Sequence, residues 1–182
     1  MIIYFVRHGE TEWNAAKRTQ GRTDKPLNSA GRKQAEQARQ QLSDTRIDAI
    51  FSSPLSRAVE TAEIINEAFS LPITIEDALI ERDHGWLEGL VIDAKERSRH
   101  WNYNDNPKDG GESPQDVFDR VHRFIDRLSQ GYAGKSVLLV GHGGTARAAR
   151  FYFEPLPSDG DIGPLCPPNC DISIYKLTKE DK

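Results

Sequence analysis

Several features that would decide the class of a protein are scarce or missing in this sequence of 182 residues. Its 2 cysteines, Cys166 and Cys170, are too few for a disulfide framework, which favours the reducing cytoplasm. No apolar run approaches the ~20 residues of a membrane-spanning helix, and residues 2–6 are too short for a signal-peptide core. Basic residues are not in excess, since 24 Lys and Arg face 28 Asp and Glu. We therefore expect a cytoplasmic protein that binds neither a membrane nor a nucleic acid.

Length and composition together indicate one globular domain. Hydrophobic residues make up 37% and charged residues 29%, which is polar for a folded protein but too apolar for a disordered one. A chain of this length buries about 70% of its unfolded surface, so it can fold without disulfides or metal ions. We expect a single domain over residues 1–182, with a short turn-rich insertion at about 89–113.

Strand-like and helix-like patterns alternate along the chain, which indicates a layered α/β fold. Apolar or alternating runs predict strands at residues 2–7, 47–51, 73–75, 136–140 and 171–177. Helical spacing predicts helices at 29–42 (with Ser29 as cap), after 52–54, at about 92–101, from 113 and after 144. Residues 8–28 show no clean period, so we expect a long loop of the kind that is usually functional.

Two of the five histidines stand in glycine-flanked tripeptides at predicted strand ends. His8 follows the first strand in Arg7-His8-Gly9, and His142 follows the strand at 136–140. Arg57 lies one turn into the helix after residues 52–54. Because ligands of open α/β sheets bind beyond the carboxyl ends of the strands, we expect these side chains to meet in one cationic pocket. Guanidinium groups make bidentate hydrogen bonds to phosphate oxygens, so a small phosphorylated ligand is favoured.

A histidine in such a pocket has two chemical roles open to it. Its neutral nitrogen can attack phosphorus, or the ring can only donate a hydrogen bond. Neighbouring arginines lower the pKa of an imidazole and so keep it neutral. A leaving alcohol also needs a proton, which a carboxylic acid can supply. The segment 79–89 offers Glu81, Asp83 and Glu88 for that role.

These residues are part of a longer series of motifs that resembles the histidine phosphatase superfamily, also called phosphoglycerate-mutase-like. The series comprises Arg7-His8-Gly9-Glu10-Thr11 with Trp13-Asn14, Gln20-Gly21, Asp24-Lys25-Pro26-Leu27, Gly31 with Gln34-Ala35, Ser52 to Ala58 with Thr61-Ala62, Leu79 to Gly89, Gly110 to Ser113, and Val140 to Gly144. The motifs follow the family's order and span nearly the whole chain, whereas a lone Arg-His-Gly would be a weak signal. The resemblance implies a three-layer α/β/α fold with a mostly parallel central sheet.

The resemblance also implies roles for single residues. His8 would be the nucleophile that becomes phosphohistidine, and Glu81 the acid that protonates the leaving group and then activates water. Three further side chains would stabilise the transferred phosphoryl group, namely Arg7, Arg57 and His142. Substrate contacts would come from Asn14, Gln20, Gly21 and His84. Many relatives have an aromatic or small residue at the last of these positions, where the histidine would touch substrate or modulate the acid. No metal and no cofactor is implied.

Short connections favour hydrolysis over a mutase reaction. Mutases of the family carry a longer insertion and a closing tail, whereas the stretch from Gly89 to Ser113 is short, as is the stretch after the last strand. An open pocket admits water, and the chain is similar to the phosphatases, including the ribazole-phosphate phosphatases of cobalamin synthesis. We expect a metal-independent phosphomonoesterase whose partner is a small phosphorylated metabolite. The alternatives are a phosphoglycerate mutase and a non-catalytic phospho-ligand binding module, and a homodimer is left open.

Structural roles are expected for several other residues. Solvent-facing positions are expected for two helical histidines and for a basic cluster of the long loop, namely His100, His122, Lys17, Arg18 and Arg22. Trp101 is expected to pack within the insertion, with a place at the substrate mouth as the alternative. For Glu81 the alternative is a salt bridge to Arg82. The two cysteines have no nearby histidine and lack the four ligands of a zinc site.

Overall fold

The structure, a computed structural model, describes residues 1–107 and 110–178. Its centre is a five-stranded sheet with the order β3-β2-β4-β1-β5. The strands are β1 (Ile2–Arg7), β2 (Ala49–Ser52), β3 (Ile73–Ile75), β4 (Ser136–Gly141) and β5 (Ile172–Lys176). The first four run parallel, and β5 pairs antiparallel with β1 at one edge. The predicted mostly parallel sheet is therefore confirmed.

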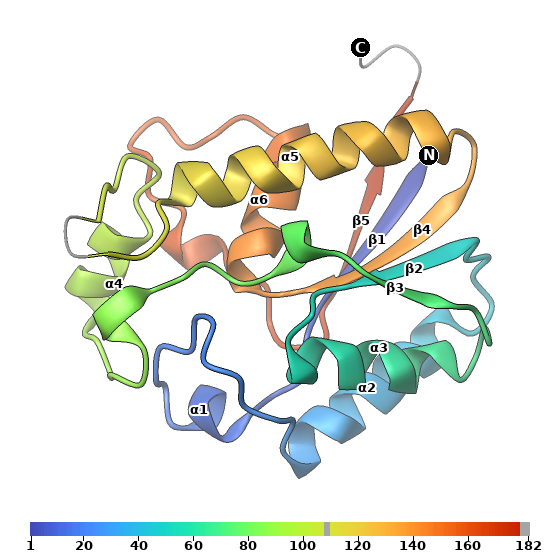
Figure 1. Ribbon diagram of the computed structural model, residues 1–182, viewed down its shortest axis with the longest axis horizontal. Coiled ribbons are helices and arrows are strands. Elements are labelled where there is room, and N and C mark those ends of the chain that lie inside the picture. Colours follow the sequence, from blue (N-terminus) through green and yellow to red (C-terminus); the bar gives the residue numbers. More distant parts are fainter. Residues whose placement is uncertain (108–109, 179–182) are drawn as a thin grey trace.

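Helices cover both faces of this sheet and complete three layers (Figure 1). One layer consists of α2 (Ser29–Leu42) and α3 (Ser56–Asn66), and the other of α5 (Pro114–Gly131) and α6 (Gly143–Phe153). Neighbouring residues of β4 serve opposite layers: Leu138 packs in the cluster that contains Ala62, and Leu139 in the cluster that contains Val121. This alternation follows from the two-residue period of a strand, and it explains why β4 reads as a continuous apolar run.

The long helix α5 begins where its sequence predicts. Ser113 Oγ accepts a hydrogen bond from the backbone N–H of Asp116, whose carboxylate in turn accepts from the Ser113 backbone N–H. Pro114 stands at the first helical position, where a missing N–H costs nothing. The apolar positions of α5 are buried against the sheet, as the helical period requires.

Two local predictions were wrong. The stretch predicted as loop contains a short helix, α1 (Glu12–Ala15), which Thr11 and Asn14 close with a capping box. Asn28 caps α2, because its Oδ1 accepts from the backbone N–H of Gly31 at 2.8 Å, whereas Ser29 is the first helical residue. A single helical turn has no period to recognise, so only its capping residues could have revealed α1.

The insertion contains one helix, α4 (Ala94–His100), inside the predicted range. Three single 3₁₀ turns stand elsewhere in the connections: η1 (Asp77–Leu79), η2 (Gly85–Leu87) and η3 (Gly163–Leu165). Lys108 and Asp109, which belong to the predicted insertion, lie outside the described residues.

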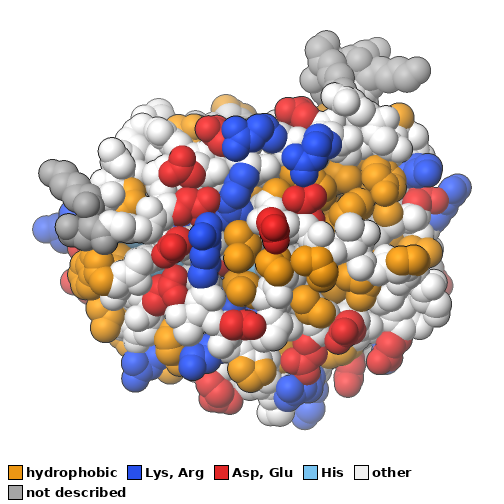
Figure 2. All heavy atoms as spheres, viewed as in Figure 1, with side chains coloured by type: hydrophobic (Ala, Val, Ile, Leu, Met, Phe, Trp, Pro, Cys, Tyr) orange, Lys and Arg blue, Asp and Glu red, His pale blue; other side chains and the backbone are white. Residues whose placement is uncertain are grey.

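One face of the molecule presents charges of both signs. On the face drawn in Figure 2, acidic and basic side chains are interspersed rather than gathered by sign. Across residues 1–107 and 110–178, no helix has the length and apolar character needed to cross a membrane.

Candidate active site

A cavity of about 370 Å³ lies where β1 and β4 end. The two strands are neighbours, and their ladder pairs Arg7 with Gly141, so the loops that follow them emerge side by side. The cavity wall takes residues from both loops, from the stretch 14–21 and from the segment between β3 and α5. The cavity is therefore at the edge of the sheet where the sequence places the site.

His8 stands at this edge as the first residue after β1. Its side chain lines the cavity although the residue is only 3% exposed. Nδ1 lies 2.7 Å from the carbonyl oxygen of Gly9, and because a carbonyl can only accept, Nδ1 carries the proton. In the neutral ring Nε2 then keeps its lone pair. Burial, Arg57 and Arg7 hold the pKa of His8 well below 6.5, although the bond to Gly9 opposes them.

Gly9 is required by close packing at this turn. A Cβ atom on Gly9 would lie 2.4 Å from the carbonyl oxygen of Gly31, at the start of α2. The Gly9 N–H donates to Thr61 Oγ1 of α3 at 3.1 Å. These contacts fix the backbone around His8 from the α2–α3 layer, so the ring orientation is built into the fold.

His142 touches His8 but does not line the cavity. The two ring centroids lie 5.0 Å apart, and the His142 residue is fully buried. Its Nε2 lies 2.7 Å from Ser53 Oγ, while Nδ1 has no hydrogen-bond partner among the described residues. Burial, Arg57 and His8 hold the pKa of His142 well below 6.5, so this ring is neutral at pH 7.

Arg57 and Arg7 bring two cations to the cavity. Arg57 is fully buried and donates to the carbonyls of Gly21 at 2.7 Å and Thr23 at 3.1 Å. Burial lowers the pKa of Arg57 to about 10, against the opposing effect of Glu81 and Asp24, so it is charged at pH 7. Arg7 donates to the carbonyl of Pro167 at 2.7 Å and to Cys166 Sγ at 3.3 Å.

Carboxylates pair only weakly with these two guanidinium groups. The nearest carboxylate to Arg57 within the described residues is that of Asp24, at 3.8 Å, and for Arg7 none lies within 4.0 Å. The Nε atoms of both arginines are buried without a hydrogen-bond partner in this part of the chain. A buried charge without a counterion is unfavourable, so this arrangement favours a bound anion.

Glu81 is the one of the three predicted acid candidates that lines the cavity. Its carboxylate oxygens accept from the backbone N–H of Gly144 at 3.0 and 3.2 Å, and one also accepts from the N–H of Arg82 at 2.8 Å. The Asp83 carboxylate instead accepts a hydrogen bond from the backbone N–H of Gly85, and the Glu88 carboxylate accepts from the backbone N–H groups of Arg22 and Thr23. These two carboxylates therefore support loops beside the site.

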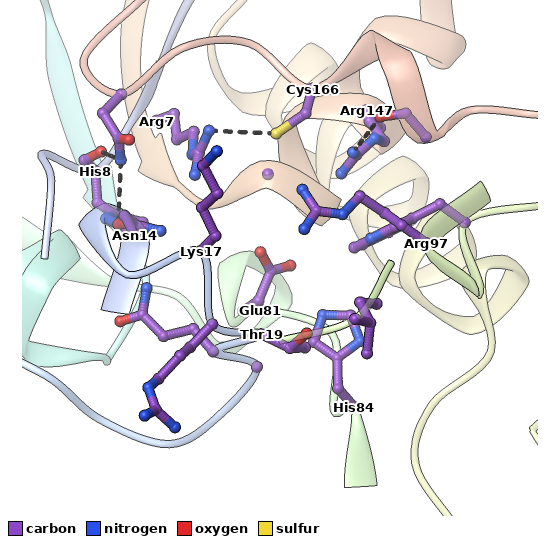
Figure 3. A pocket seen from close by; sticks show the side chains of 18 of the residues that line it. Arg7, His8, Asn14, Lys17, Thr19, Glu81, His84, Arg97, Arg147 and Cys166 are labelled. Carbon is purple, nitrogen blue, oxygen red and sulfur yellow. Dashed lines mark hydrogen bonds between the residues drawn. The ribbon is translucent and has the colours of Figure 1, made fainter. Parts of the chain in front are cut away.

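The alternative of a Glu81–Arg82 salt bridge is not what the structure has. The Arg82 side chain is fully buried and turns away, to the Asp105 carboxylate at 3.0 Å and the carbonyl oxygen of Glu112 at 2.6 Å. Glu81 is thus free to face the cavity, opposite Arg7 and Cys166 (Figure 3).

The four predicted substrate-contact residues all line the cavity: Asn14, Gln20, Gly21 and His84. Gln20 accepts from Thr11 Oγ1 at 3.0 Å, and its Nε2 is buried without a partner in the described structure. Gly21 has a φ of 58°, which suits glycine, and its carbonyl holds Arg57. The loop therefore serves the site both directly and through that arginine.

The cavity is also lined by basic residues that were not predicted from the sequence to belong to the site. Lys17 and Arg18 are exposed, as expected for a solvated face, and they also line the cavity together with Arg97 and Arg147. Arg147 is almost fully buried, donates to the carbonyls of Ile162 and Gly163, and lies 4.1 Å from the Trp101 ring centroid. Figure 3 shows Lys17 and Arg97 reaching into the space around Glu81.

The position of Arg147 in the cavity wall could have been predicted from spacing. It stands four residues after Gly143, and residues four apart lie on the same face of a helix. Lys17 and Arg18 carried no such signal. Their direction depends on α1, which has no readable period.

His100 was predicted on a solvated surface and that prediction was wrong. It is 7% exposed, and its Nε2 lies 2.6 Å from His84 Nδ1. Trp101 packs in the core beside both rings, as expected, and also reaches the cavity wall. His122 is partly buried, with its Nε2 near the carbonyl of Ala148. Tertiary packing of the insertion decides these positions, and local sequence does not encode it.

No metal-binding cluster stands out in the described ranges, where no group of three or more His, Cys, Asp or Glu side chains could hold an ion. The cavity instead has six basic residues and one carboxylate in its wall: Arg7, Lys17, Arg18, Arg57, Arg97, Arg147 and Glu81. This donor set suits an anion with several oxygens.

Comparisons with known proteins agree with this geometry. The uncharacterized phosphatase PhoE of Bacillus subtilis (strain 168) is 41% identical over 146 residues, 80% of this chain and 74% of the relative. The probable phosphoglycerate mutase GpmB of Salmonella choleraesuis (strain SC-B67) is 40% identical over 148 residues, 78% of this chain and 69% of the relative.

Solved structures share the fold along nearly the full length. YhfR of Bacillus stearothermophilus superposes with a TM-score of 0.87 at 28% identity, covering 98% of this chain and 92% of that one. A mycobacterial glucosyl-3-phosphoglycerate phosphatase in complex with VO3 superposes with a TM-score of 0.86 at 27% identity, covering 99% and 93%. The sequence model of the histidine phosphatase superfamily (branch 1) matches residues 3–182. The chain therefore belongs to branch 1 of the histidine phosphatase superfamily and is an enzyme of the phosphatase class.

Proposed function

We propose that the protein hydrolyses a small phosphorylated metabolite without a metal ion, through a phosphohistidine intermediate on His8. His8 Nε2 attacks phosphorus while the bond from phosphorus to the leaving oxygen breaks, and Glu81 as a carboxylic acid gives its proton to that oxygen. The Glu81 carboxylate then takes a proton from water, whose oxygen attacks phosphorus and releases phosphate from His8. Arg7 and Arg57 stabilise the phosphoryl group in both steps, and His142 supports the His8 ring against which it packs.

One observation carries this proposal: the His8 imidazole presents a lone pair to a cavity that also contains the guanidinium groups of Arg7 and Arg57 and the carboxylate of Glu81. A nucleophile, an electrostatic clamp and a proton donor are the three components that phosphoryl transfer to a histidine requires. A protein that only bound phosphate would have no use for a carboxylate beside the anion, because like charges repel.

The proposed substrate class follows from the size and charge of the cavity. About 370 Å³ suits a small metabolite, and Asn14, Gln20 and Gly21 contribute polar groups to its wall. Two similar structures are named after molecules of this kind: a mycobacterial glucosyl-3-phosphoglycerate phosphatase, and an Escherichia coli protein at 29% identity named as a putative alpha-ribazole-5'-P phosphatase. The cationic outer wall formed by Lys17, Arg97 and Arg147 supports a substrate with a second acidic group.

A phosphoglycerate mutase is the second candidate, since relatives of this chain include proteins named as probable phosphoglycerate mutases. The two activities separate in one assay with 3-phosphoglycerate. A mutase converts it to 2-phosphoglycerate, whereas a phosphatase releases inorganic phosphate.

The test of the proposal is hydrolysis of an aryl phosphate by the wild type and His8→Ala. We expect the variant to lose the activity, and EDTA to leave the wild type unaffected. His122→Ala is the matched control, because His122 lies between α5 and α6, away from the cavity. Full activity of the His8→Ala protein, or none in the wild type, would reject the proposal.

A further inference from the structure

His84 is a buried titratable group at the cavity wall that the proposed reaction does not use. It is 6% exposed, and its Nδ1 lies 2.6 Å from His100 Nε2. Its other ring nitrogen, Nε2, has no hydrogen-bond partner among the described residues and is not sealed from solvent. Because His84 lines the cavity, Nε2 is the polar atom that it offers to a bound molecule.

Both rings of the His84–His100 pair are neutral at pH 7. Burial, His100 and Arg82 hold the pKa of His84 well below 6.5, and burial with Arg82 lowers the pKa of His100 to about 4, although Asp105 opposes this. Two neutral imidazoles in one hydrogen bond have one donor and one acceptor between them. The proton in that bond therefore belongs to one ring, and the choice fixes which nitrogen of each ring is bare.

Asp105 determines this choice. Its Oδ2 lies 3.6 Å from His100 Nδ1 and also pairs with Arg82 at 3.0 Å, so the carboxylate is held in place beside the His100 ring. A carboxylate repels a lone pair and attracts an N–H, which puts the His100 proton on Nδ1. His100 Nε2 then accepts from His84 Nδ1–H, and His84 Nε2 is left unprotonated toward the cavity.

We propose that His84 is a specificity-determining residue that accepts a hydrogen bond from a hydroxyl group of the leaving alcohol, with His100 and Asp105 as positioning residues. This inference rests on the proposed phosphatase function and names part of its substrate. A hydroxyl fits better than an ammonium group, because the cations of the cavity, among them Arg97 and Arg147, repel a positive ligand. The leaving group is accordingly a polyol or a hydroxy acid.

The first test compares two probes that differ in their hydroxyl groups. Glycerol 3-phosphate and n-propyl phosphate are used as competitors of p-nitrophenyl phosphate hydrolysis, so that inhibition constants are obtained whether or not they turn over. We expect the wild type to bind glycerol 3-phosphate about 10-fold more tightly. His84→Phe, which keeps a ring of similar size, brings the ratio to about one, and His122→Phe as control retains it.

The second test reads the proton positions directly. Long-range ¹H–¹⁵N spectra of the imidazole rings report which nitrogen carries hydrogen. We expect His84 Nε2 to be unprotonated in the wild type, and Asp105→Asn, whose amide can donate toward His100, to reverse the tautomers of both rings. A merely structural role for Asp105 would leave these signals in place.

The outcomes separate this inference from the function it rests on. If the wild type shows no aryl phosphate hydrolysis that depends on His8, the proposed function is rejected. Three results reject the inference alone while hydrolysis stays normal. The wild type and His84→Phe show the same preference for the hydroxylated probe, the wild type shows no such preference, or His84 Nε2 carries a proton. The spectra of the wild type decide the matter if His84→Phe does not fold.

Discussion

Replacing Gly144 with alanine tests the position of Glu81 without changing any ionisable group. The Gly144 N–H donates to both carboxylate oxygens of Glu81, and a Cβ there would lie 2.3 Å from Oε1 and 3.0 Å from a ring carbon of Trp101. Ordinary contacts are about 1 Å longer than the first of these distances. The carboxylate must therefore move by roughly that amount, and its hydrogen bonds to the α6 N-terminus weaken.

A displacement of about 1 Å at a reacting group can lower a rate by roughly 100-fold. We expect kcat of Gly144→Ala to fall between about 10-fold and 100-fold for phenyl phosphate, and by less for p-nitrophenyl phosphate, whose leaving group needs no proton. The fold should tolerate the change, because alanine favours the helix by about 1 kcal/mol over glycine and the far end of Glu81 is flexible.

The assay is steady-state kinetics with both aryl phosphates, alongside thermal unfolding of each variant. Gly131→Ala is the matched control, since no atom lies within 4 Å of its added Cβ at the end of α5. A folded Gly144→Ala protein with wild-type kcat on phenyl phosphate would refute the placement of Glu81 as the acid.

Three further predictions follow from the same geometry. Glu81→Gln should slow turnover of phenyl phosphate and accumulate phosphoenzyme, measured by quench-flow, whereas Asp83→Asn, at a half-buried residue that does not line the cavity, should not. Arg97→Gln should weaken binding of 3-phosphoglycerate relative to glycerol 3-phosphate by about 10-fold, as one charge-assisted contact is lost, and Arg99→Gln on the same helix, paired with Glu96 on the surface, should leave that ratio unchanged. The free energy of unfolding should fall as the pH drops below 6.5, because histidines of the unfolded chain then bind protons and the buried histidines of the folded chain do not. The loss is about 1.4 kcal/mol per pH unit for each such histidine. Those with a lowered pKa are His8, His84, His100 and His142. Equal melting temperatures at pH 7.0 and 5.5 would contradict the last prediction.

The sheet and its covering helices could be predicted because their signals are local and repeated. The run at 136–140 is apolar at every position after Ser136, as expected for a strand covered on both faces, and it forms β4. Ser113-Pro114 and the helical period that follows likewise predict α5. Strand ends then placed His8 and His142 together, since neighbouring parallel strands end at one edge.

The errors lie where long-range contacts decide the structure. His100 looks solvent-facing on a short polar helix, and only the packing of α4 beside Arg82 and Asp105 buries it. Lys17 belongs to a loop without a period, so its direction toward the cavity could not be derived from spacing. Residues of irregular segments around the site are thus the least predictable part of it, although they form much of its wall.

The most direct test of the account is to identify the residue that carries phosphate during turnover. Glu81→Gln protein is mixed with a ³²P-labelled aryl phosphate, quenched within one turnover, and mapped by peptide mass. We expect one acid-labile, base-stable phosphoryl group on the peptide that contains His8, and none in the His8→Ala variant. Turnover without label on His8, or label on another residue, would contradict it.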